Sequence, residues 1–416
     1  MKTAAPQVEH VQRRVLRVLT ATQVLGAAGM AIGLAVSTLI AAALSGSDAV
    51  GGFAQTAAVT GAAVISLLAA RIAVRRGRRP ALVLGYGLGA LGAVIAALAV
   101  IAGQWILLLA ALVLFGGASS ANLAARYAAT DLAHPHRRAR ELSMVVWAAT
   151  IGAVVGPNLA DPAGRVASGF GLPVGAGPFL LGAVVLATAA LAVHLALRPD
   201  PLVIVREAKP VVPSHCGGGG APGGLRTWAT LTPAARLALA GMTLCHTAMV
   251  GLMSMTPVHM NHAGSSLKVV GVVISLHIAA MYAASPLFGW MADKLGRIPV
   301  LAIGAALVVA ASGIAGMAPS HEAPQLAAGL ALLGFGWSAG LVAGSALLTE
   351  SVAVADRPAA QGLSDLCMNV GGAVGGAVSG IVVTAWSYAS LGLIVGFTAL
   401  PLLVVCLFVT LRRPVG

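Results

Sequence analysis

Twelve apolar stretches dominate this sequence, and each is close to the roughly 20 residues that an α-helix needs to cross a lipid bilayer. They lie at about 18–43, 50–72, 81–102, 105–130, 143–160, 177–197, 233–258, 268–291, 298–318, 325–349, 364–386 and 390–411. Only 9% of the 416 residues are charged and 58% are hydrophobic, which leaves too few polar residues to cover a soluble protein of this length. The sequence therefore predicts an all-α membrane protein with twelve transmembrane helices.

The charge, the cysteines and the motifs argue against several other classes of protein. The formal net charge is +13, but the basic residues form short clusters between apolar stretches and not one continuous basic face. The four cysteines are scattered, without the spacing of a disulfide-stabilised domain. The sequence has no phosphate-binding loop and no nucleophile and base at catalytic spacing. We therefore expect neither nucleic-acid binding nor enzymatic activity.

The twelve stretches fall into two sets of six, separated by residues 198–232. This segment is rich in proline and contains the run Gly217 to Gly220, a composition that is typical of a flexible linker. We expect an N-terminal six-helix bundle over 1–197, a cytoplasmic linker over 198–232 and a C-terminal six-helix bundle over 233–416.

The distribution of basic residues predicts the orientation in the membrane. With both termini in the cytoplasm, the outward loops contain only Arg165 and Lys268 of the 25 Lys and Arg residues. The basic clusters at 71–79, 137–140 and 294–297 then all lie on the cytoplasmic side. Because cytoplasmic loops carry the excess of Lys and Arg, we predict that both termini are cytoplasmic.

The two halves are repeats of one another at an offset of about 219 positions, a spacing that favours pseudo-symmetric bundles. Residues 77–85 and 296–304 then superpose with five of nine identical. The same offset pairs Asp131 with Glu350 and superposes the glycines at 152 and 156 on those at 371 and 375. Parallel six-helix repeats are typical of transporters that bind substrate near the midplane of the membrane.

A motif in the second half identifies the family that this repeat resembles. Gly289, Asp293, Lys294, Gly296 and Arg297 match the Gly-x-x-x-Asp-Arg/Lys-x-Gly-Arg signature of the major facilitator superfamily. The resemblance extends over nearly the whole chain. It implies a secondary transporter of twelve helices in two bundles that works by alternating access, with a monomer as the norm of the superfamily.

The same motif predicts charged contacts that act as conformational latches. Asp293 can cap the N-terminus of a neighbouring helix, Arg297 can reach Glu350, and Arg78 can reach Asp131. The first-half copy is degraded, because Ala70 and Val74 replace the expected glycine and aspartate, which weakens the case for its latch. The alternative is that these basic residues serve only as topology signals.

The seventh apolar stretch carries an unusual density of sulfur. Met242, His246, Met249, Met253 and Met260 fall on one helix face at 100° per residue, and Cys245 borders it. The eighth stretch carries His277 and Met281 one helical turn apart. Counted from the connecting loop, Met249 and His277 lie at about the same depth.

Thioether sulfur and neutral imidazole are ligands that suit Cu(I) and disfavour Mg²⁺ or Ca²⁺. The alternative is that the methionines fill gaps between helices and that His277 bonds to a neighbouring helix. An ionisable residue such as histidine is costly within a membrane span, however, and is therefore usually functional there.

The pattern Met249-x-x-x-Met253 followed by His277-x-x-x-Met281 resembles the paired motifs of the CcoA-type copper importers of the superfamily. This resemblance implies that the chain imports copper across the bacterial cytoplasmic (inner) membrane for assembly of cbb3-type cytochrome oxidase. It also implies that these four residues are the ligands, that copper is the substrate and that no prosthetic group is present.

Several further residues are weaker candidates for metal binding. Met242, Cys245 and His246 border the predicted site, and His259 and Met260 lie at the predicted outer mouth. In the linker, Cys216 can pass copper to a cytoplasmic acceptor, because a thiolate binds Cu(I) more tightly than a thioether.

Three other functions stay open. Uptake of a small organic molecule such as riboflavin is the nearest alternative, with Trp147, Tyr282 and Trp337 as possible stacking partners. Proton-driven drug efflux is the second, and Arg126 and Asp365 are polar residues that can serve coupling or gating. A membrane-bound metal sensor is the third, but it should carry a soluble output domain.

Overall fold

The computed structural model describes residues 4–208, 224–262 and 267–411, and it is all-helical over these residues. Twelve segments of the described chain are long and apolar enough to cross a membrane. The prediction of an all-α, multi-pass membrane protein with twelve transmembrane helices is confirmed. The helices are α1 Ala4–Ser45, α2 Asp48–Arg76, α3 Arg78–Ile101, α4 Trp105–Phe115, α5 Gly117–Ala128, η1 Pro135–Arg137, α6 Arg138–Gly169, α7 Ala176–Ala196, α8 Pro201–Ala208, α9 Gly224–Thr230, α10 Pro233–His262, α11 Leu267–Ala283, α12 Ser285–Leu295, α13 Arg297–Gly316, α14 Ala323–Glu350, α15 Arg357–Ala385 and α16 Tyr388–Leu411.

The chain divides into two compact units, and each is described by itself. Unit 1 consists of Met1–Ala133, Ala148–Thr230 and Val352–Asn369. Unit 2 consists of His134–Trp147, Leu231–Ser351 and Val370–Gly416. The start of α6 therefore belongs to unit 2 and the start of α15 to unit 1. The division into bundles over 1–197 and 233–416 stays a prediction.

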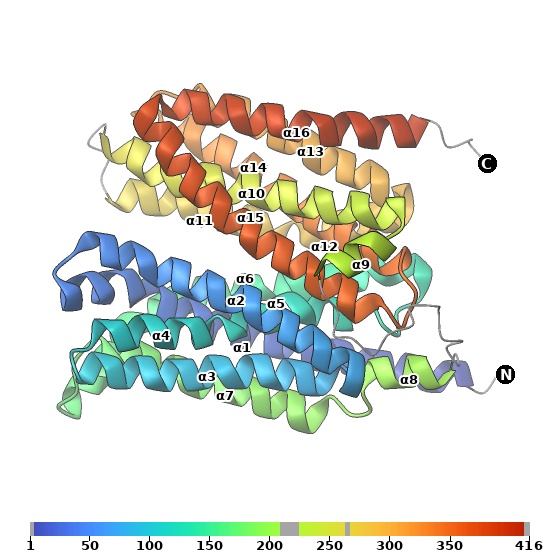
Figure 1. The fold of residues 1–416 in the computed structure, drawn as a ribbon, viewed down its shortest axis with the longest axis horizontal. Coiled ribbons are helices and arrows are strands. Elements are labelled where there is room, and N and C mark those ends of the chain that lie inside the picture. The colour runs from blue at the N-terminus through green and yellow to red at the C-terminus, as the bar shows by residue number, and fades with distance from the viewer. Residues whose placement is uncertain (1–3, 209–223, 263–266, 412–416) are drawn as a thin grey trace. The chain divides into compact units, whose positions relative to one another are not determined.

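Small residues allow the helices of unit 1 to approach closely. In Figure 1, α3 runs beside α7 and α4. At Gly61 of α2, a side chain would collide with the backbone of Val113 on α4, and at Gly116 it would collide with the backbone of Ala58. Helix packing in membranes depends on such close contacts, because lipid leaves little hydrophobic driving force between helices.

The central element of unit 2 is α14. Every residue from 336 to 349 is buried, as expected for a helix that is apolar on all sides. Helices α10, α11 and α13 all pack against it. A methyl group at Gly340 would lie 2.8 Å from the sulfur of Cys245 on α10, and one at Gly334 would lie 2.7 Å from the carbonyl oxygen of His277 on α11. The glycines of α14 therefore determine how closely α10 and α11 approach.

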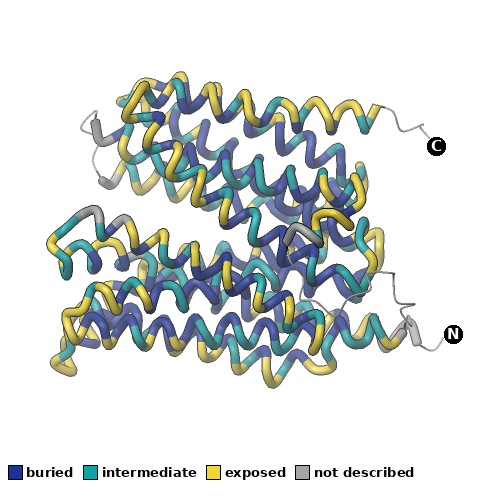
Figure 2. Tube along the Cα trace, viewed as in Figure 1, coloured by how far each residue is buried: buried dark blue, intermediate teal, exposed yellow. Residues whose placement is uncertain are grey.

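Many large apolar side chains are exposed, as expected for helices that face lipid. On α16, which packs against α13, the exposed residues include Leu393, Phe397, Val404 and Phe408. Figure 2 shows exposed and buried segments alternating along this helix. One side of α16 therefore packs on the unit, and the other is free for lipid.

The segment between the two sets of spans differs from the expectation of an unpacked linker over 198–232. Its start forms α8, on which Leu202 is fully buried. Asp200 accepts a hydrogen bond from the backbone N–H of Arg79 at 2.7 Å, and Arg206 donates to the carbonyl of Val74 at 2.8 Å. This helix docks because Asp200 satisfies a free N–H group in the first turn of α3. Residues 209–223 lie outside the described part.

Two glycines form matching turns between consecutive spans. Gly77 joins α2 to α3 with φ +94°, and Gly296 joins α12 to α13 with φ +99° and ψ 162°. This region of backbone conformation is nearly restricted to glycine. The repeat at 77–85 and 296–304 therefore preserves a turn that the backbone requires.

We predict that Gly296→Ala destabilises the protein by roughly 1–3 kcal/mol through backbone strain alone. The space is open enough, since an added methyl would lie 3.6 Å from its nearest neighbour, Pro299. Gly313→Ala is the matched control, because it lies within α13 with nothing within 4 Å. Thermal unfolding in detergent should show a lower melting temperature for Gly296→Ala only. Equal melting temperatures for the two variants would contradict this account of the turn.

Candidate functional site

The methionine-rich face of α10 lies partly against α14. Met242 is buried, and its sulfur accepts a hydrogen bond from the Ser345 hydroxyl at 3.3 Å. Cys245 is buried beside Gly340. Because Met242 lies near Gly344 and Cys245 near Gly340, α10 and α14 run antiparallel. These two residues therefore contribute to helix packing in unit 2.

His246 belongs to an aromatic cluster that links three elements of unit 2. The indole N–H of Trp337 on α14 donates to Nδ1 of His246 at 2.9 Å. Trp337 also packs edge to face on Tyr282 of α11, with ring centroids 5.5 Å apart. Since an indole only donates, the neutral His246 ring accepts at Nδ1 and carries its proton on Nε2. In this form the lone pair of Nδ1 is occupied by the indole N–H and is not available to a metal.

His277 presents the opposite arrangement. Its side chain is fully buried, and Nδ1 lies 2.7 Å from the backbone carbonyl oxygen of Leu330 on α14. A carbonyl only accepts, so Nδ1 carries the proton and Nε2 keeps its lone pair. Nε2 is buried and has no hydrogen-bond partner among the described residues. His277 is therefore held in one tautomer, with an unused acceptor inside the unit.

The other predicted ligands differ in burial. Met249 and Met281 are buried, and Met253 is half-buried. Continuing the antiparallel register of α10 along α14, Met249 and Met253 reach the level of about residues 332–336. His277 contacts α14 at Leu330 and Gly334, so the two pairs share one level. That all four bind a single ion stays a prediction.

The composition of the described residues determines the ligands that a metal would find. They contain no group of three or more His, Cys, Asp or Glu side chains able to hold a metal ion. A site on α10 and α11 would therefore depend on thioether sulfur. His259 is half-buried and Met260 fully buried near the end of α10, whereas Cys216 lies outside the described residues.

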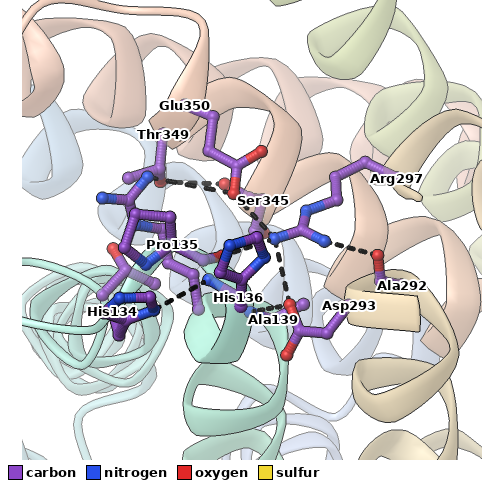
Figure 3. Close-up of polar contacts among 12 residues, drawn as sticks. His134, Pro135, His136, Ala139, Ala292, Asp293, Arg297, Ser345, Thr349 and Glu350 are labelled. Carbon is purple, nitrogen blue, oxygen red and sulfur yellow. Dashed lines mark hydrogen bonds and ion pairs between the residues drawn. The ribbon is translucent and has the colours of Figure 1, made fainter. Parts of the chain in front are cut away.

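Asp293 caps the start of α6 within unit 2. Its carboxylate accepts the backbone N–H groups of Ala139 at 3.2 Å and Arg140 at 2.9 Å. Figure 3 shows Asp293 beside Ala139. A carboxylate at a helix N-terminus is favoured by the helix dipole and by the unsatisfied N–H groups there. Arg297 lies 3.0 Å from the same carboxylate. The motif residue Asp293 therefore fixes the first turn of α6.

Arg297 continues this network to α14. It donates to Glu350 at 2.8 Å and to the carbonyl of Pro135 at 2.9 Å. Figure 3 shows its guanidinium between Glu350 and Asp293. Arg138 adds a longer contact to Glu350 at 3.8 Å. The ion pair expected between Arg297 and Glu350 is thus present, and its role as a latch stays a prediction.

Unit 1 contains the related pair at greater depth. Arg78 bonds Asp131 through two nitrogens, at 2.7 and 3.1 Å, and donates to Gln361 of α15 at 2.6 Å. The two charged side chains are only 4% and 0% exposed. The pair forms although Val74 lacks the carboxylate of the motif, and its latch role also stays a prediction.

A second buried ion pair in unit 1 was not predicted as a pair. Arg126 of α5 donates to Asp365 of α15 at 2.8 Å and lies over the ring of Tyr127, 4.5 Å from its centroid. The hydroxyl of Tyr127 in turn donates to Ser364. The available signal was the presence of single opposite charges in two apolar spans, since such charges are usually paired.

The twelve apolar helices, the repeated glycine turns and the motif network together define a multi-pass secondary transporter. The chain belongs to the Major Facilitator Superfamily, whose family model matches residues 18–267 and 237–416. This is a family of transporters, which confirms that the chain is not an enzyme.

Two curated relatives cover most of the chain. It is 38% identical over 397 residues to YdeG of Bacillus subtilis, described as an uncharacterised MFS-type transporter, covering 95% of this chain and 91% of the relative. It is 29% identical over 363 residues to the riboflavin transporter RfnT of Brucella anthropi, covering 86% and 85%.

Solved structures share the fold. The human organic anion transporter MFSD10 (TETRAN) superposes with a TM-score of 0.78 at 16% identity, covering 95% of this chain and 99% of that one. A bacterial homologue of the iron transporter ferroportin, in its outward-facing state, gives 0.75 at 13% identity, covering 96% and 100%. At these identities the likeness concerns the fold alone.

We predict that Asp131→Ala destabilises the protein by about 3–5 kcal/mol, because it leaves the Arg78 charge buried without a counter-ion. Replacing both partners, Arg78→Met with Asp131→Leu, should recover most of the loss. The control is Asp161→Ala, since Asp161 pairs with Arg165 at an exposed site where such pairs contribute roughly 0–1 kcal/mol. Unfolding in detergent measures all three. A loss no larger than that of the control would contradict the buried-pair account.

Proposed function

We propose that this transporter imports Cu(I) and binds it at Met249, Met253, His277 and Met281. Copper is the transported substrate in this proposal and not a resident cofactor. The observation that supports it most is the buried lone pair on Nε2 of His277, which has no partner among the described residues.

This nitrogen is costly for the protein unless something binds it. A buried acceptor left without a hydrogen bond costs about 1–3 kcal/mol. If His277 served only to join α11 to α14, its bond to the Leu330 carbonyl would be sufficient, and an unused second nitrogen would bring no benefit. Histidines that bind metals commonly donate their other ring N–H to a backbone carbonyl or carboxylate, which fixes the tautomer. His277 has this arrangement.

The neighbouring sulfur atoms determine which ion is favoured. Met249 and Met281 are buried, and the first acidic residue after the start of α10 is Asp293, at the end of α12. A set of neutral thioether and imidazole ligands favours soft Cu(I) over hard divalent cations. Neutral ligands also hold the ion weakly enough for release, which transport requires.

The resemblance to the CcoA-type importers supports the remaining parts of the proposal. Copper would move inward across the bacterial cytoplasmic membrane, reach a cytoplasmic acceptor and serve assembly of cbb3-type oxidase. Both termini would lie in the cytoplasm, in accord with the distribution of basic residues. The chain would work as a monomer.

A small organic substrate is the second candidate. It is favoured by the likeness to a riboflavin transporter and by the cluster of Trp337, Tyr282 and His246. Two aromatic rings are suitable groups for stacking on a planar heterocycle.

We predict that His277→Ala reduces copper accumulation by at least ~10-fold, because the only ligand with an oriented nitrogen is lost. The double change Met249→Leu with Met253→Leu should act in the same direction, since leucine keeps the volume but removes the sulfur. Radiolabelled copper uptake into cells that express equal amounts of protein gives the measurement.

Matched controls separate ligand loss from general damage. His194→Ala removes an exposed histidine of α7, and Met144→Leu removes a methionine of α6 that is 50% exposed. Both should retain full uptake. Unchanged uptake in the His277→Ala variant would refute the site.

The organic candidate is tested with radiolabelled riboflavin in proteoliposomes that contain the purified full-length protein. If copper is the substrate, riboflavin uptake should not exceed that of empty liposomes. Saturable riboflavin uptake that is lost in Trp337→Leu and retained in Met249→Leu would favour the second candidate, because it would assign transport to the aromatic cluster.

A further inference from the structure

An open cavity of about 420 Å³ lies in unit 2 where α10, α13 and α15 end and α16 begins. Its lining includes His259, Met317, Ala318, Ser387 and Tyr388. No acidic or basic residue other than the histidine lines it within the described chain. Arg297 begins α13 and Met317 follows its end, so the cavity and the Arg297 network lie at opposite ends of that helix.

The ring of Tyr388 is held by a hydrogen bond and stacks on the ring of His259. The Thr256 hydroxyl donates to the carbonyl of Leu252 at 2.9 Å, so its single proton is used. The Tyr388 hydroxyl, 2.8 Å away, must then donate to Thr256. The His259 ring stacks on the Tyr388 ring at a centroid distance of 4.2 Å and an interplanar angle of 12°. The imidazole is therefore held flat against a buried, hydrogen-bonded ring.

The second contact of His259 determines which nitrogen is available. Nε2 lies 3.1 Å from the carbonyl oxygen of Ala318. Because a carbonyl only accepts, the neutral ring carries its proton on Nε2 and keeps a lone pair on Nδ1. This is the arrangement of His277 with the two nitrogens exchanged, and it is typical of histidines that bind metals.

The residue before Ala318 is a methionine, which supplies a thioether sulfur. Met317 directly precedes Ala318, lines the same cavity and is 78% exposed. At this exposure the side chain makes little contact with the rest of the unit. Methionine has three rotatable bonds, so its sulfur can move toward the ring that is tied to the adjacent residue.

We propose that this cavity is a second soft-metal site, at which Nδ1 of His259 and the sulfur of Met317 bind Cu(I) or its analogue Ag(I). A neutral nitrogen and a neutral sulfur favour such ions over Mg²⁺ or Ca²⁺. Binding here does not require the His277 site. Its role as the place where copper is first loaded rests on the proposed function.

The test is the oxidation of Met317 by hydrogen peroxide in the purified full-length protein, followed by peptide mass spectrometry. Accessible thiols are first blocked with N-ethylmaleimide so that they do not take up Ag(I). Bound Ag(I) occupies the sulfur lone pair, so sulfoxide formation at Met317 should slow by about fivefold or more. Met144 is the internal control, because it is also exposed and should oxidise at an unchanged rate.

Two variants decide between the explanations. His259→Phe keeps a ring to stack on Tyr388 but removes the nitrogen, and it should abolish the protection of Met317. His277→Ala should leave that protection intact, so failure of the copper-import proposal does not affect this result. A rate at Met317 that Ag(I) leaves unchanged, or protection that persists in His259→Phe, would overturn the second site.

The loading role has its own measurement. Met317→Leu should raise the copper concentration for half-maximal uptake by about threefold to tenfold while the maximal rate is kept, because fewer ions are captured at low concentration. Met144→Leu is again the control. An unchanged half-maximal concentration would overturn the loading role.

Discussion

The buried helix α14 is the constraint on which the arrangement of unit 2 depends. Its glycines at 334, 340 and 344 let α10 and α11 pack directly on its backbone. The close approach at Gly334 also allows the carbonyl of Leu330 to reach His277 at 2.7 Å. A larger residue at Gly334 would separate α11 from α14 and weaken this bond. The chemistry of the imidazole therefore depends on a helix contact that requires the absence of a side chain.

Charge in the spans follows a second constraint, since a buried charge is costly in a membrane unless it is paired. In unit 1, Arg78 pairs with Asp131 and Arg126 pairs with Asp365, and all four side chains are at most 4% exposed. In unit 2 the pair of Arg297 with Glu350 is more open, since their side chains are 12% and 30% exposed. The two halves therefore share the arginine–acid pair but differ in how far its side chains are buried. Breaking the deep pairs is expected to be far more costly than breaking the open one.

The parts of this structure that could be predicted from the sequence are those with a local or repeated signal. Span length gave the twelve helices, and the offset between the halves indicated that Arg78 and Arg297 meet the acids at 131 and 350. The contact of Arg126 with Asp365 joins residues 239 positions apart, so no repeat or helical spacing in the sequence predicts it. The docking of α8 was missed because a proline-rich composition hides the single carboxylate of Asp200 that caps α3. Met317 was not predicted as a ligand because it is a single methionine, whereas the sequence argument depended on the methionines clustered on α10.

The histidines of unit 2 show why residue type alone was insufficient to identify ligands. His246 receives the Trp337 N–H on Nδ1, so this nitrogen has no free lone pair. His277 and His259 each donate to a carbonyl and so present a lone pair, on Nε2 and Nδ1 respectively. The sequence does not distinguish the three rings, and only their hydrogen-bond partners determine which nitrogen carries the proton. His259 lines an open cavity, whereas His277 is buried. His246 instead belongs, with Trp337 and Tyr282, to an aromatic cluster of the same unit.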